Sequence, residues 1–275
     1  YFTLSANQNN ADAQFYLGII YKDGKYVPVD INKSIHYFTL AANQNDSVAQ
    51  YNLGVIYFSG KHIPIDIKKA IHYFTLSANQ NNANAQFYLG IIYADGKYVP
   101  IDINKSIHYF TLAANQNNPE TQFIFGFLYL TNEHFPRDIK KAIYFITLAA
   151  NQNHLIAQCI LGQIYYRNEF IPIDINKAIH YFTLAAHQNH SDSQYFLGYI
   201  YLSNKYVTAD IEKAIYYFSL AANQNHPKAQ FNLGLIYYSG KYIKQDIKKA
   251  ILYLSLAANQ NQPEAQFILG LVYLD

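Results

Sequence analysis

Apolar and polar residues alternate along this chain with the spacing of amphipathic helices. Between residues 31 and 44, apolar or small side chains recur at the i, i+3, i+4 and i+7 positions that form one face of a helix. These residues are Ile31, Ser34, Ile35, Phe38, Ala41 and Ala42. A second such face lies between residues 11 and 23, at Ala13, Leu17, Ile20 and Tyr21. The pattern predicts two helices, here called A and B, joined by a short loop.

Residues at the predicted helix ends support this assignment. Gly24 follows helix A, and Asp30 precedes helix B, where its carboxylate is expected to accept backbone N–H groups of the first turn. Asn45 follows helix B, where asparagine tolerates a left-handed conformation. In other copies of the loop, Asn132, Asn168 and Asn204 replace the glycine, which predicts a positive φ at these positions.

The helical pair is repeated along the whole chain of 275 residues. Gly18 recurs at Gly54, Gly90, Gly126, Gly162, Gly198, Gly234 and Gly270, always 36 residues apart. A fixed period of this length is typical of solenoids, in which each unit buries its apolar face against its neighbours. We therefore predict an all-α fold, a right-handed α-solenoid (superhelix) of helix-turn-helix repeats.

The predicted organisation is a single repeat array, cut from a longer chain because Tyr1 aligns with Tyr37 in the middle of a unit. Seven full A/B pairs are expected, with a half-unit at each end. The units are 11–46, 47–82, 83–118, 119–154, 155–190, 191–226 and 227–262, and the half-units are 1–10 and 263–275.

The order of residues within a unit resembles the Sel-one-like repeat family, a branch of the tetratricopeptide-type helical repeats. The resemblance rests on Ala49, Leu53 with Gly54, Tyr57, Gly60, Asp66, Lys69 with Ala70, Tyr73, and Ala113 with Ala114. It implies that the A helices line the concave face of the superhelix, where such repeats bind peptides as adaptors. The chain departs from the family pattern at Leu40, where the family often has a charged residue, and at Asn45, where it often has glycine.

Composition restricts the partners. The net charge is only +2 and no basic stripe is visible, so nucleic acid is not expected. No apolar run reaches the roughly 20 residues of a membrane span. The single cysteine, Cys159, favours a reducing compartment such as the cytoplasm. Four glycosylation sequons leave the lumen of the secretory pathway as the alternative. They begin at Asn32, Asn45, Asn104 and Asn189.

A candidate binding groove lies on the side of helix A opposite Leu17, at the positions of Phe15, Ile19 and Lys22. This side is largely apolar, so it either packs between neighbouring A helices or lines a groove. Variation at the third position leaves room for partner specificity. The candidate partner-binding residues are Phe58, Ile91, Phe127, Leu130, Tyr166, Tyr199, Leu202 and Tyr238.

A second candidate surface is a row of leucines on the outer side of helix B. An exposed apolar row of this kind would mark an interface, whereas tyrosine and lysine stems from adjacent helices would hide it. We call this row the leucine ridge; its members are Leu40, Leu76, Leu112, Leu148, Leu184 and Leu220.

Residues capable of catalysis or metal binding do not converge in this sequence. Equivalent histidines are one unit apart, roughly 10 Å, which is too far to share an ion. His187 and His190 lack a third ligand, and Cys159 is interpreted as a small apolar filler. Neither a metal site nor a cofactor is expected.

The sequence therefore predicts a non-catalytic scaffold or adaptor that binds a protein or peptide segment in the groove. The alternative is a regulatory or self-assembling arm of a larger protein whose catalytic domain lies outside this stretch. Self-association through the ends or through the leucine ridge remains a third possibility.

Overall fold

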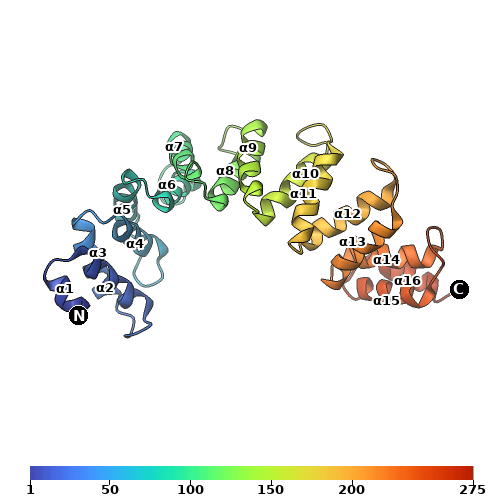
Figure 1. The fold of residues 1–275 in the computed structure, drawn as a ribbon, viewed down its shortest axis with the longest axis horizontal. Helices are drawn as coiled ribbons and strands as arrows, with labels where there is room; N and C mark the ends of the chain where they lie inside the picture. Colours follow the sequence, from blue (N-terminus) through green and yellow to red (C-terminus); the bar gives the residue numbers. More distant parts are fainter. Residues whose placement is uncertain (275) are drawn as a thin grey trace. The chain divides into compact units, whose positions relative to one another are not determined.

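The computed structural model describes residues 1–274, and every regular element in that stretch is a helix (Figure 1). The predicted all-α fold class is confirmed. The helices are α1 (Phe2–Asn7), α2 (Ala11–Asp23), α3 (Ile31–Asn43), α4 (Ser47–Ser59), α5 (Ile67–Asn79), α6 (Ala83–Asp95), α7 (Ile103–Ala114), α8 (Pro119–Thr131), α9 (Ile139–Asn151), α10 (Leu155–Tyr166), α11 (Ile175–His187), α12 (Ser191–Ser203), α13 (Ile211–Asn223), α14 (Pro227–Ser239), α15 (Ile247–Ala258) and α16 (Pro263–Val272).

The chain forms two compact units, residues 1–145 and 146–275. The even-numbered helices are the predicted A helices and the odd-numbered ones the B helices. Within the first unit, α2 packs on α3, α4 on α5 and α6 on α7; within the second, α10 packs on α11, α12 on α13 and α14 on α15. Each B helix also packs on the next A helix of its unit, so each unit is a stack of helical hairpins.

An aspartate caps each B helix from α3 to α15, as the sequence predicts. Asp66 Oδ1 accepts the backbone N–H of Lys69 at 3.0 Å, and this bond holds the pKa of the Asp66 carboxyl below its usual value. The Lys69 ammonium forms an ion pair with Asp66 Oδ2 at 3.4 Å and lies 5.0 Å from the centre of the Tyr57 ring. The same backbone bond recurs at Asp30, Asp102, Asp138, Asp174, Asp210 and Asp246.

Left-handed residues end many of the helices. Gly24 has φ 70° and Asn45 has φ 68°, which confirms both predictions. A positive φ was also predicted for the three asparagines that replace the loop glycine. Asn204 has φ 47°, which confirms the prediction, but it is wrong for Asn132 and Asn168. Asn132 has φ −83°, and Asn168 also lies outside the left-handed region, because α10 already ends at Tyr166 with Arg167 in an extended conformation.

The recurring glycine lets each A helix approach the aromatic ring of its B helix. A Cβ atom added at Gly54 would lie 2.5 Å from Cδ1 of Phe74, a residue with no exposed surface. In the first and third hairpins a buried serine strengthens the contact, since Ser34 Oγ donates to the Gly18 carbonyl at 2.8 Å and Ser106 Oγ to the Gly90 carbonyl at 2.8 Å. The glycine is therefore needed for close packing.

Buried glutamines tie neighbouring hairpins together. Gln50 Nε2 donates to the Ala42 carbonyl at the end of the preceding B helix at 3.2 Å. Its Oε1 accepts from Gln80 Nε2 at 2.8 Å, so one side chain joins the ends of two successive B helices. The glutamine pair recurs as Gln14 with Gln44, Gln86 with Gln116, Gln158 with Gln188, Gln194 with Gln224 and Gln230 with Gln260.

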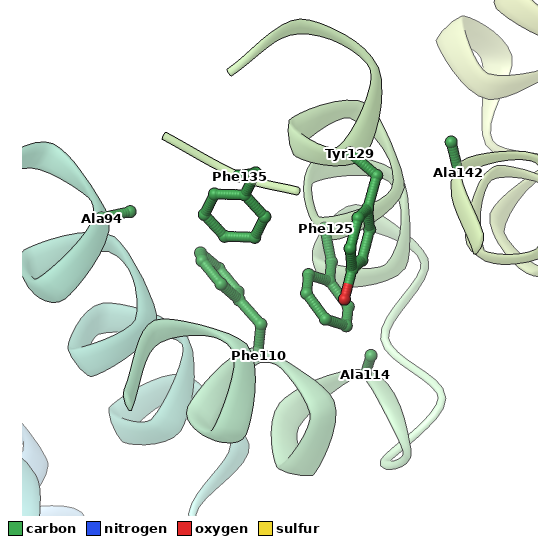
Figure 2. Close-up of a cluster of buried hydrophobic side chains, with 7 residues drawn as sticks. All are labelled: Ala94, Phe110, Ala114, Phe125, Tyr129, Phe135 and Ala142. Carbon is green, nitrogen blue, oxygen red and sulfur yellow. The ribbon is translucent and has the colours of Figure 1, made fainter. Parts of the chain in front are cut away.

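The core of the first unit continues from one hairpin to the next. Figure 2 shows the buried rings of Phe110, Phe125, Tyr129 and Phe135 packed together. The Phe110 and Phe125 rings stack with their centres 5.4 Å apart, and Phe135 reaches this cluster from the loop that follows α8. Buried surface is thus shared between adjacent repeats, as a solenoid requires.

Candidate partner-binding surfaces

The side of the A helices opposite Leu17, called here the A-helix face, is only partly covered. Its first two positions are four residues apart, so their side chains meet on the helix surface. On α8, the Phe123 and Phe127 rings stack at 5.6 Å, and Phe127 keeps 36% of its surface exposed. On α12, Tyr195 and Tyr199 lie 6.4 Å apart, and Tyr199 is 42% exposed. On each helix the second ring of the pair is exposed, whereas Phe123 and Tyr195 are half-buried.

Other candidate groove residues contribute mainly to packing. Ile91 and Leu130 are half-buried against the cluster around Phe110 and Phe125, and Leu202 is half-buried against the cluster around Phe218. Tyr238 is also half-buried.

Phe58 belongs to an aromatic cluster that joins two repeats. Its ring lies 6.3 Å from Phe74 of its own hairpin, 5.6 Å from Tyr88 of the next A helix and 5.8 Å from Tyr98 of the next loop. Phe74 and Tyr88 stack at 5.0 Å. The position of Phe58 on the A-helix face therefore does not make it freely accessible.

Tyr166 repeats this arrangement in the second unit. It lies 6.4 Å from Phe182, 5.8 Å from Phe196 and 6.0 Å from Tyr206. Burial raises the pKa of the Tyr166 hydroxyl to about 12. Like Phe58, this residue joins one repeat to the next.

In some copies, the residue at the third position of the A-helix face is matched to a residue of the next A helix. Where the position is Lys22, the next A helix supplies Asn52, whose Oδ1 accepts from the lysine ammonium at 2.9 Å. The ammonium also lies 5.9 Å from the centre of the Phe38 ring. Lys22 and its acceptor Asn52 are 30 residues apart in sequence, and Phe58 is 30 and 40 residues from its aromatic neighbours Tyr88 and Tyr98. Comparing residues at these separations would have revealed the contacts between repeats, which inspection of single positions misses.

The leucine ridge is unevenly exposed. Leu76 and Leu112 each keep 37% of their surface exposed. Leu40, Leu148, Leu184 and Leu220 are half-buried. Leu220 also lines a hollow of about 330 Å³ with His187, Tyr216 and Tyr217. Adjacent side chains therefore cover the ridge only in part.

The thiol and the histidines show no reactive arrangement in the part of the chain that is described. Cys159 is buried, its Sγ accepts from Gln163 Nε2 at 3.4 Å, and burial raises the pKa of the thiol. A raised pKa disfavours the nucleophilic thiolate. His36 and His72 pack edge-on against the tyrosines that follow them. Among residues 1–274, no three His, Cys, Asp or Glu side chains are placed to hold a metal ion.

His226 acts as a helix cap in the second unit. Its Nδ1 accepts the backbone N–H of Ala229 at 3.2 Å, so Nε2 carries the proton that is shared with Asp192 Oδ1 at 3.1 Å. The ring stacks on Tyr195 at 4.8 Å, and burial lowers the histidine pKa although Asp192 opposes this shift. Lys228, on the same helix, also disfavours the charged imidazole.

We expect His226 to make the second unit less stable in mild acid. Because its folded-state pKa lies below the unfolded value of about 6.5, its stabilising effect is complete above that pH and is lost as the pH falls through the folded-state pKa. Urea unfolding between about pH 7.5 and 5 measures this loss. His226→Asn keeps a capping side chain without titration, so its stability should fall less; equal pH slopes for both proteins would contradict the assignment.

No described helix combines the length and the apolar character that crossing a membrane requires.

Helical hairpins that stack in order and share their cores with their neighbours define a helical-repeat protein of the α-solenoid class. The chain belongs to the Sel1 repeat family, whose model matches residues 11–46, 47–82, 83–118, 126–154, 155–190, 191–226 and 227–262. The resemblance to Sel-one-like repeats is thereby confirmed. Proteins with Sel1 repeats are generally protein-interaction scaffolds.

The solved structures of two similar proteins have this fold. One is c5321, a protective antigen present in uropathogenic Escherichia coli strains that displays an SLR fold. It is 26% identical with a TM-score of 0.85, and the alignment covers 99% of this chain but only 59% of c5321. The other is a Sel1 repeat protein from Oxalobacter formigenes, 29% identical with a TM-score of 0.73, over 100% of this chain and 79% of that one. No curated protein matches the sequence.

Proposed function

We propose that this chain is a non-catalytic scaffold whose A-helix face binds a segment of another protein. The observation that carries the proposal is an exposed aromatic ring on this face in each unit: Phe127 in the first unit, stacked on the half-buried Phe123, and Tyr199 in the second unit, beside the half-buried Tyr195. Aromatic side chains are typical anchors of protein interfaces, because they bury a large apolar surface against the partner.

The partner that fits this face is a peptide with apolar or aromatic side chains. In the neighbouring repeats, half-buried aliphatic residues occupy the position of Phe127 and Tyr199: Ile91 one repeat before Phe127 and Leu235 one repeat after Tyr199. A cytoplasmic location belongs to the same proposal, because the buried Cys159 is a free thiol.

Single substitutions at the exposed anchors test the proposal. Peptides selected from a displayed random library on the wild-type protein would be measured against Phe127→Ser and Tyr199→Ser by fluorescence anisotropy. We expect at least one anchor variant to weaken its peptide by about tenfold or more, about 1.4 kcal/mol, because hot-spot aromatic residues dominate such interfaces. Phe58 and Tyr166 are unsuitable test positions, since their rings also hold repeats together.

The matched control is Leu76→Ser with Leu112→Ser, which removes similarly exposed apolar surface from the leucine ridge. If Phe127→Ser and Tyr199→Ser bind the peptides as tightly as the wild-type protein does, the proposal that the A-helix face binds the partner is refuted.

A second candidate function, self-assembly, draws support from the exposed part of this ridge. If it is correct, sedimentation velocity at increasing concentration should show association that Leu76→Lys with Leu112→Lys abolishes.

A further inference from the structure

Lysines of the first unit gather at one edge of the helix stack. The connections of α2 to α3, α4 to α5 and α6 to α7 all lie at this edge, because each hairpin has its loop at the same end. Residues 22–33, 58–69 and 94–105 contain eight lysines and five aspartates. At the opposite edge, Asp12 and Asp46 face no lysine or arginine within residues 6–14 and 42–50. The small net charge of the whole chain hides this segregation.

Several of these lysines are not neutralised. Lys33, Lys69 and Lys105 form ion pairs with their cap aspartates. By contrast, no acidic side chain of residues 1–274 lies within ion-pair distance of Lys25, Lys61 or Lys68. The ammonium of Lys25 lies 5.3 Å from the centre of the Tyr26 ring. Because the ring carries no negative charge, this contact does not neutralise the lysine.

An exposed aliphatic side chain accompanies the lysine in each of these loops. Val29, Ile65 and Ile101 keep 50%, 43% and 39% of their surfaces exposed. Each lies against its loop glycine; a Cβ atom added at Gly60, for example, would be 2.8 Å from Cγ1 of Ile65. The aliphatic groups are therefore held in place at the surface. Positive charges and exposed apolar groups in a row along one edge are typical of a surface that binds a partner.

The middle loop also forms a hollow of about 510 Å³. Its apolar part consists of Ile63, Pro64, Ile65 and Ile67, and its polar part of Tyr57, Asp66, Lys68 and Lys69. Because the Lys69 ammonium is engaged by Asp66, Lys68 is the charge that remains for a ligand beside the apolar surface. An aliphatic side chain next to a carboxylate matches this combination.

We propose that this loop edge binds an extended acidic segment of a partner protein. Carboxylates of the segment lie beside Lys25, Lys61 and Lys68, and an aliphatic side chain occupies the hollow beside Ile65. Packed helices are roughly 10 Å apart and an extended chain rises about 3.3 Å per residue, so acidic residues that meet the lysines of successive loops stand about three positions apart in the partner. The surface is separate from the A-helix face, and either proposal can fail without the other.

A designed peptide tests this proposal. The probe is a fluorescent peptide of about nine residues in which the triplet Glu-Leu-Ser is repeated, and its binding to the 275-residue protein is followed by anisotropy at low and at about 0.15 M salt. We expect binding that weakens with salt, and weaker binding of a peptide with the same composition but clustered glutamates. Equal binding of both peptides, or binding of neither, would overturn the proposal.

Charge reversal at the loop edge provides the second arm. Lys61→Glu with Lys68→Glu should weaken the peptide by about tenfold or more, because both substitutions place like charges beside the ligand. Neither lysine caps a helix, and circular dichroism would verify that the variant is folded. Lys228→Glu, in the first turn of α14, reverses a charge away from this edge and should change affinity less than about twofold.

Three outcomes of these experiments would refute the assignment to an acidic peptide. Lys228→Glu could weaken the peptide as much as the loop-edge variant does. Vesicles containing phosphatidylserine, or a single-stranded oligonucleotide, could bind through the same lysines while the peptide does not.

Discussion

Replacing Phe74 by alanine is expected to destabilise the first unit by about 3–5 kcal/mol, the usual cost of removing a buried ring. Phe74 has no exposed surface. Its ring stacks on Tyr88 at 5.0 Å, lies 6.1 Å from Tyr51 and covers Gly54. Since these neighbours come from α4 and α6, alanine would open a cavity between repeats as well as within one.

Phe2→Ala is the matched control. Phe2 stands one period before Phe38 and two before Phe74 in the repeat, yet 49% of its surface is exposed, so its loss should cost less than about 1 kcal/mol. Urea unfolding followed by far-UV circular dichroism, with amide hydrogen exchange to localise the effect, measures both variants. Equal losses would show that the position of the ring in the array does not determine its contribution.

Gly54→Ala is expected to destabilise the protein by about 1–3 kcal/mol, although alanine normally favours a helix over glycine. The added methyl group would meet the Phe74 ring at 2.5 Å, and this buried ring is already packed against Tyr51 and Tyr88.

The same substitution at Gly270 should have the opposite sign. In α16, nothing lies within 4 Å of a Cβ atom added at Gly270, so only the helix preference remains and alanine should stabilise by up to about 1 kcal/mol. Thermal and urea unfolding of the two variants compare identical chemistry in two environments. Destabilisation at both glycines would mean that helix flexibility, rather than the approach of the ring, explains their recurrence.

Most of the fold could be predicted because its determinants are local or strictly periodic. The 36-residue interval, the Asp30 cap and the left-handed Asn45 each depend on a few adjacent residues, and the structure has all three. Asn132 shows the limit of this reasoning. An asparagine permits positive φ without requiring it, and α8 ends there with an extended residue instead.

The candidate surfaces were harder to predict because they depend on contacts between repeats. Sequence placed Phe58 and Tyr199 on one face, but only the structure shows that Phe58 packs between hairpins while Tyr199 stays exposed. The buried Gln50 was missed because a polar residue gives no apolar signal, although its invariance from copy to copy was visible. The charged edge was missed because counting charges over the chain does not reveal which loops are neighbours.

The matched sets around Lys22 and Phe58 imply that these similar modules are not interchangeable. If the hairpins 47–82 and 83–118 exchanged places, Lys22 would face Tyr88 instead of Asn52 and lose its amide acceptor. Phe58 would then face Ile124 and lose its contact with the Tyr88 ring, while keeping Phe74 of its own hairpin. Unequal crossing-over between copies of the repeat in the gene would therefore produce arrays with mismatched junctions, and this penalty would help to preserve the individual sequence of each copy.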